Sequence, residues 1–133
     1  MAAGINILVN DGGAPCRIMK LGDAGADLDA GTIVEFAAAG NIVAAAEDLP
    51  SYLNRHVGVL FVDATSGDPA SVITGRGAVV FLKAASGSIA RGDKLGHDAA
   101  GLAKTALSSD ERMAIALEAK GITHTGFVKA LLL

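Results

Sequence analysis

One stretch decides the fold: Ala30-Gly31-Thr32-Ile33-Val34, a turn at Gly40-Asn41, and then the apolar run Ile42-Val43-Ala44-Ala45-Ala46. About sixty residues later the chain repeats this pattern with Arg91-Gly92-Asp93-Lys94-Leu95, a turn at Ala100-Gly101 and a second apolar run. A repeated supersecondary unit usually builds a shared core, since one copy cannot bury its apolar face alone. The repeat therefore predicts architecture first and function only indirectly.

Each copy continues with two further apolar runs. In the first copy these are residues 56–62 and 77–82, and in the second they are residues 113–118 and 126–132. The first copy also carries an insertion at residues 64–76. Short apolar runs separated by Gly-containing turns are typical of all-β proteins. We expect a mainly β fold, a small β-barrel or β-sandwich-like domain built from two related strand-hairpin units, with little helix.

Residues 110–120 fit two structures. They are good helix formers that Ser109 could cap, and Gly121 follows as a helix-terminating glycine would. Residues 113–119 also alternate between larger apolar and smaller or polar side chains, as a strand does. Because the matching run in the first copy is β-branched and contains glycine, we predict a strand at 113–119.

Composition excludes several classes of protein. The 133 residues include 17 Gly, four Phe and one Tyr, and the net charge is −3. Without a cluster of Lys and Arg or many aromatic side chains, direct nucleic-acid binding is not expected. No uncharged apolar stretch approaches the ~20 residues that span a bilayer, so no membrane partner is expected. The single Cys16 cannot form an internal disulfide, which weakly favours a reducing cytoplasm.

The chemistry of an active site is largely missing. His56, His97 and His124 are isolated in the sequence rather than spaced as metal ligands. Cys16 has no neighbouring base to activate it. Gly75-Arg76-Gly77 has only part of a dinucleotide-binding fingerprint, and the acidic residues between Asp23 and Asp68 are explained as solvated turns. We therefore predict no enzyme activity, no cofactor and no metal.

The first 29 residues lie outside the repeat. We predict two parts, an N-terminal arm at residues 1–29 and a duplicated β domain at residues 30–133. Ile5, Ile7 and Val9 alternate with Asn6, Leu8 and Asn10, as in a short strand. The arm either packs on the core of the repeat or stays extended until a partner orders it.

Four segments of the second half resemble one family, the bacteriophage head decoration (capsid cement) proteins. They are Ile89-Ala90-Arg91-Gly92-Asp93-Lys94-Leu95, the turn Ala99-Ala100-Gly101, the strand Ala114–Ala119, and the terminal run Val128–Leu132. The resemblance covers residues 30–133 and rests on a pattern of strands and turns. The first copy departs from this pattern, with Gly31-Thr32 where Gly-Asp is expected.

The resemblance implies a virion structural protein, made in the host cytoplasm, that binds the outer surface of an assembled capsid. It would stabilise contacts between major capsid protein subunits, as a homotrimer. Candidate capsid contacts are Ile5, Ile7 and Val9, which could add a strand to a sheet edge of the capsid protein. Candidate oligomer contacts are Leu131, Leu132 and Leu133. Phe61, Phe81 and Phe127 fit either the trimer contact or the core of the domain.

Two other classes of function stay open. One is a β-barrel binding or carrier module of the biotinyl or lipoyl type, which carries its modified Lys at a hairpin tip. Lys94 is the candidate lysine, although Leu95 follows it and it lies at a strand start. The other is a small β-barrel enzyme, which the missing catalytic residues disfavour.

Overall fold

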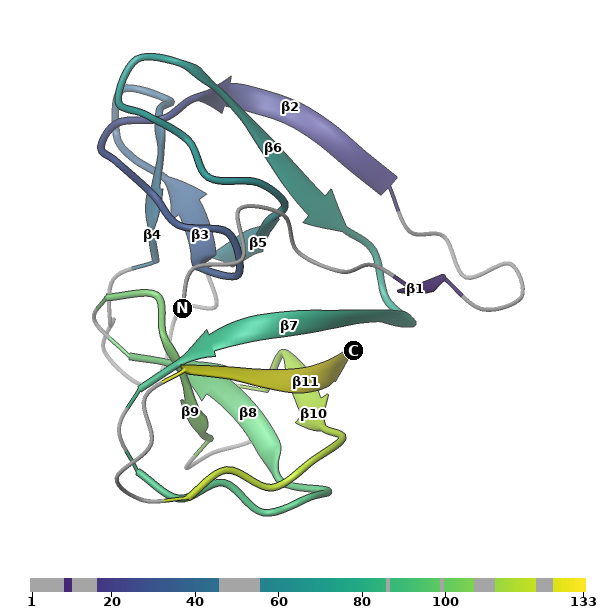
Figure 1. Ribbon diagram of the computed structural model, residues 1–133. Helices are drawn as coiled ribbons and strands as arrows, with labels where there is room; N and C mark the ends of the chain where they lie inside the picture. The colour runs from purple at the N-terminus through teal and green to yellow at the C-terminus, as the bar shows by residue number, and fades with distance from the viewer. Residues whose placement is uncertain are drawn as a thin grey trace.

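The computed structural model describes residues 9–10, 17–45, 56–85, 87–98, 100–106, 112–121 and 126–133. All regular structure in these residues is β, which confirms the predicted fold class (Figure 1). The strands are β1 (Val9–Asn10), β2 (Arg17–Asp23), β3 (Ile33–Phe36), β4 (Ile42–Ala44), β5 (His56–Leu60), β6 (Pro69–Thr74), β7 (Ala78–Ala84), β8 (Lys94–His97), β9 (Ala103–Thr105), β10 (Ala114–Ala116) and β11 (Gly126–Leu132).

The strands form two sheets, one above the other in Figure 1. The first contains β2-β6-β5-β3-β4, and the second β1-β7-β11-β10-β8-β9. A parallel pairing of Ala84 with Ala103 joins β7 to β9 and closes five strands of the second sheet into a small barrel. A parallel bridge between Ala24 and Ile42 lies at the corresponding place in the first sheet. We call residues 17–74 unit 1 and residues 78–132 unit 2.

The two units have the same topology. In each, the first strand lies beside the fifth, and the order continues through the fourth and second to the third. Backbone hydrogen bonds repeat as well: Gly31 donates to Leu60, and Gly92 donates to Ala116. Both glycines have positive φ, 89° and 92°, a conformation that glycine adopts without steric cost. The duplication predicted from these turns is therefore present in the backbone.

The last strand of unit 1 differs from the sequence expectation. Residues 77–82 were matched with residues 126–132, but they form β7, the first strand of unit 2. The true counterpart of β11 is β6, within the segment interpreted as an insertion. β6 reads PASVIT and carries polar side chains, so it resembles β11 less than the apolar β7 does. The apolar composition of β7 therefore led to its being matched with β11 in place of β6.

The segment at 113–119 contains β10 at Ala114–Ala116, which pairs with both β8 and β11. This pairing confirms a strand here, although it is shorter than the predicted 113–119. Residues 107–111, where the alternative helix would begin, lie outside the described residues.

Unit 1 buries both faces of its sheet. Val34, Leu60 and Val72 belong to a cluster made only of unit 1 side chains. Their neighbours Ile33, Val59 and Ile73 belong to a second cluster, whose other members come mostly from unit 2. All six side chains are 0% exposed. Because successive residues of a strand point to opposite faces, these adjacent apolar pairs connect the core of unit 1 to that of unit 2.

Two segments of the predicted arm are part of these sheets. β2 pairs along its length with β6, and β1 pairs with β7 through Val9 and Val79. Residues 1–8, including Ile5 and Ile7, lie outside the described residues. The division at residue 29 stays a prediction.

Candidate interaction surfaces

The contact between the units is built from a turn of unit 1 and the first strand of unit 2. The Lys83 amide donates to the Gly31 carbonyl at 2.9 Å, and the Ile33 amide donates to the Gly101 carbonyl at 2.9 Å. A Cβ on Gly31 would lie 2.9 Å from Cε1 of Phe127, so the turn needs a residue without a side chain there. Phe81 also approaches this glycine through its backbone carbonyl.

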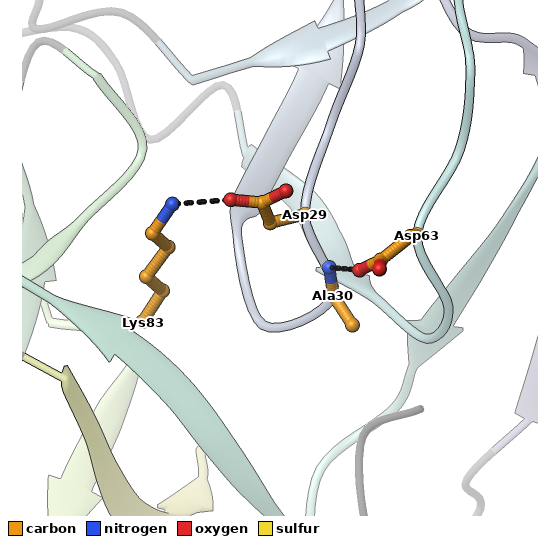
Figure 2. A network of polar contacts seen from close by, with 4 residues as sticks. All are labelled: Asp29, Ala30, Asp63 and Lys83. Carbon is orange, nitrogen blue, oxygen red and sulfur yellow. Dashed lines mark hydrogen bonds and ion pairs between the residues drawn. The ribbon is translucent and has the colours of Figure 1, made fainter. Parts of the chain in front are cut away.

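Polar side chains hold the same turn from both sides (Figure 2). The Lys83 ammonium forms an ion pair with Asp29, and the two side chains are 38% and 46% exposed. The Ala30 amide donates to Oδ1 of Asp63 at 2.8 Å. Since the ion pair is partly solvated, we expect it to fix geometry more than to add stability.

A hollow of about 400 Å³ opens between the units. Its walls include His56, Arg76 and Leu133. The ring of His56 meets that of His97 edge-on, with centroids 6.1 Å apart. Burial, and to a lesser extent the positive charge that His97 can carry, lower the pKa of His56 below its ordinary 6.5. Nδ1 of His56 has no hydrogen-bond partner among the described residues, which fits a neutral ring.

These two histidines lie forty-one positions apart in the sequence, and both were expected to be isolated. His56 begins β5 and His97 ends β8, so only the packing of unit 1 on unit 2 brings them together. No group of three or more His, Cys, Asp or Glu in the described part of the chain is arranged to hold a metal ion. None of the described segments is a helix with the length and apolarity needed to cross a membrane.

The three candidate oligomer contacts have different surroundings. Leu132 is 6% exposed and packs in the core of its own chain. Leu131 is partly exposed on β11. Leu133 is 51% exposed and lies at the wall of the hollow. Phe61 packs against the core cluster shared by the units.

The first strand of unit 1 presents an exposed surface. Residues Arg17–Lys20 of β2 are exposed, and Ile18 and Met19 are each 43% exposed. β2 is an end strand in the order of its sheet, whereas its counterpart β7 is covered by β1 on its outer edge. In the described part of the chain, the outer edge of β2 therefore lacks a partner strand, whereas the equivalent edge of β7 is paired with β1.

The fold has a counterpart among solved structures. The chain is similar to the N base of the head fiber protein gp8.5 of bacteriophage phi29, with a TM-score of 0.64 and 20% sequence identity. The similarity covers 96% of this chain and 95% of that one. No family model matches the sequence, and no curated protein matches it either. At this identity the likeness establishes a shared fold.

Proposed function

We propose that this protein is a structural component of a phage head. One observation carries the proposal: the chain shares its fold, over almost its whole length, with a protein that forms the base of a phage head fiber. The resemblance of residues 30–133 to capsid decoration proteins supports the same assignment. A compact β core with exposed strand surfaces suits a protein whose task is to attach rather than to catalyse.

In finer detail, we propose that the chain binds the outer surface of the assembled shell and stabilises contacts between major capsid protein subunits. It would be made in the host cytoplasm and act as a homotrimer. Ile5, Ile7 and Val9 are the proposed capsid contacts, and Leu131, Leu132 and Leu133 the proposed region of oligomer contact. Because β1, which contains Val9, pairs with β7 of its own chain, a capsid contact through this segment would use the other edge of β1.

The carrier-module alternative has less support. Lys94 begins β8, is partly buried, and is paired in register with Ile115. A modified lysine must instead project freely from a turn to reach another active site.

Co-sedimentation with expanded capsids of the source particle tests the proposal. We expect the chain to pellet saturably, at a fixed ratio to the major capsid protein, and the decorated shells to resist heat or denaturant better than bare shells. An absence of pelleting at every salt concentration would contradict the proposed function.

Variants of the N-terminal segment locate the capsid contact. Ile7→Asp should weaken pelleting, because a charge disfavours burial in a side-chain pocket. Phe36→Asp, at an exposed apolar position outside β1 and β2, is the matched control and should pellet as the unaltered chain does. Equal pelleting by both variants would exclude the N-terminal segment and leave the attachment itself intact.

A further inference from the structure

The duplication gives this chain two versions of one contact, and only one version is used within the chain. On the unit 1 side of the used contact, a row of side chains crosses three strands: Ile33 is paired with Val59, and Val59 with Ile73. Each is 0% exposed, because unit 2 covers the row. On the unit 2 side, the Lys83 amide and the Gly101 carbonyl make the hydrogen bonds described above.

Unit 2 carries an equivalent row that is not fully covered. Lys94 is paired with Ile115, and Ile115 with Leu131, across the matching strands. All three are partly exposed. The adjacent turn differs in the same way: a Cβ on Gly92 would meet no described heavy atom within 4 Å, whereas one on Gly31 would meet Phe127. We call Gly92, Lys94, Ile115 and Leu131 the open row.

Unit 1 carries the matching counter-surface. The equivalent of Lys83 is Asp23, since each residue precedes the alanine that bridges to the third strand of its unit. The equivalent of Gly101 is Gly40, which closes the same kind of turn with a positive φ. Asp23 and Gly40 are exposed, and a Cβ on Gly40 would meet no described heavy atom within 4 Å. A Cβ on Gly22 would lie 2.9 Å from the Gly40 carbonyl, so Asp23 and this turn form one surface.

We propose that the open row of one copy docks on the Asp23 and Gly40 surface of a second copy, repeating between chains the contact that joins the units within a chain. The Asp23 amide would then donate to the Gly92 carbonyl of the neighbour, and the Lys94 amide to the Gly40 carbonyl. This contact would form the interface between subunits of the proposed homotrimer, and in this respect the inference rests on the proposed function.

Charge and symmetry both fit a second copy as the occupant. Arg91 and Lys94 are cationic, and they would face the acidic Asp23. The two surfaces lie on different units, so the contact is head-to-tail: each copy offers one surface and receives the other. Such a contact closes into a ring when the rotation between copies allows it. Leu131, expected from the sequence as an oligomer contact, lies in the open row.

Charge reversal tests the contact, with association of the full chain followed by light scattering and sedimentation over a dilution series. Lys94→Glu and Asp23→Lys should each raise the dissociation constant by at least about tenfold, because each places like charges together. The double variant should recover part of the lost affinity, since the charges at positions 23 and 94 are then both reversed while Arg91 keeps its charge. Arg17→Glu, at an exposed position at the opposite end of β2 from Asp23, should leave association unchanged.

A second variant copies the internal ion pair into the contact between chains. The equivalents of Asp29 and Lys83 are Ala90 and Asp23, so Ala90→Asp combined with Asp23→Lys places an Asp and a Lys opposite each other. This chain should associate more tightly than Asp23→Lys alone, by about two- to fivefold. Circular dichroism and urea unfolding show whether each variant still folds.

A chain that stays monomeric at its highest soluble concentration overturns the proposed contact, as does failure of the double reversal to recover affinity. A monomer that still pellets with capsids overturns this contact alone and leaves the proposed function standing. An oligomer with the expected charge dependence that never binds capsids overturns the proposed function alone. If Ile115→Lys abolishes capsid binding by a monomeric chain, the open row meets the capsid and the second copy is the wrong occupant.

Discussion

At Gly31 and Gly92 the same backbone turn has two different surroundings. Both residues have positive φ, so an alanine at either position should cost about 1–2 kcal/mol of unfolding free energy from backbone strain. Only Gly31 also faces Phe127, Phe81 and Lys83 of unit 2. We predict that Gly31→Ala costs about 1–3 kcal/mol more than Gly92→Ala, the added loss coming from overpacking.

Urea unfolding of both variants at a dilution that keeps the chain monomeric measures this difference. Gly92→Ala is the matched control, because it keeps the conformational strain and omits the clash. Equal losses of stability would show that the packing of unit 2 on the Gly31 turn relaxes at no cost.

His56 should make stability depend on pH. Its pKa is lowered in the folded chain, by burial first and by His97 second, so the unfolded chain binds the proton more readily. The contribution of a neutral His56 is therefore fully present above its ordinary pKa of 6.5 and is lost as pH falls from there toward the folded pKa. Among the described residues, the charged groups near it include Glu35, its register partner, and Arg76, which also lines the hollow.

We predict that the urea midpoint falls between pH 7.5 and pH 5, and that His56→Gln makes the fall smaller. His97→Gln removes only the lesser cause and should have a weaker effect. The comparison is made between variants at each pH, because other groups also titrate in this range. A pH profile that His56→Gln leaves unchanged would mean that the ring is solvated well enough to accept a proton when folded.

At the scale of the elements, the segment between β2 and β3 depends on two polar contacts of unequal value. The Lys83 and Asp29 pair is partly solvated, so Lys83→Met should cost no more than about 1 kcal/mol. Asp63→Ala removes the acceptor for the amide of Ala30, a residue that is 1% exposed, and should cost about 1–3 kcal/mol. Chemical denaturation of the two variants measures the two losses of unfolding free energy. A larger loss from Lys83→Met than from Asp63→Ala would contradict this prediction.

The strands that could be predicted from sequence are those flanked by repeated turns. Gly31 and Gly92, and likewise Gly40 and Gly101, mark the same turns in both units because each requires a positive φ. The repeat also decided β10 against a helix, where local propensity alone favoured the helix. β6 was not recognised as the counterpart of β11, because Ser71 and Thr74 flank its apolar residues, and only its pairing with β2 and β5 identifies it.

The candidate surfaces were harder to predict for the same physical reason. Alternation along a strand shows that two faces exist, but not which is covered. Ile33 and Lys94 occupy equivalent positions, and one is fully buried while the other is partly exposed. The meeting of His56 with His97 likewise depends on how the units pack. Leu131 could be proposed as a contact from sequence, but its neighbours Lys94 and Ile115 in the open row could not.

At the scale of the whole molecule, the sheet of unit 1 acts as a shared wall. Ile33, Val59 and Ile73 pack into the cluster built mostly from unit 2, while Val34, Leu60 and Val72 fill unit 1 itself. Without unit 2, the buried side chains of Ile33, Val59 and Ile73 would be exposed to solvent. Without unit 1, the side chains of unit 2 in the same cluster would be exposed. Since burying one such side chain is worth about 1.5–3 kcal/mol, the two units should not be stable apart.

We therefore predict a single cooperative unfolding transition for the whole chain. Ile33→Ala, in the wall, and Ile42→Ala, in the interior of unit 1, should each cost about 2–5 kcal/mol, because each leaves a cavity at a fully buried site. Each should lower the transition without splitting it. Calorimetry tests this through the agreement of the calorimetric and van't Hoff enthalpies, and hydrogen exchange read by mass spectrometry resolves the two units. If the amides of β7 and β11 stay protected after those of β3 and β5 have exchanged, unit 2 is stable without unit 1. The wall would then join two independent domains rather than form part of one core.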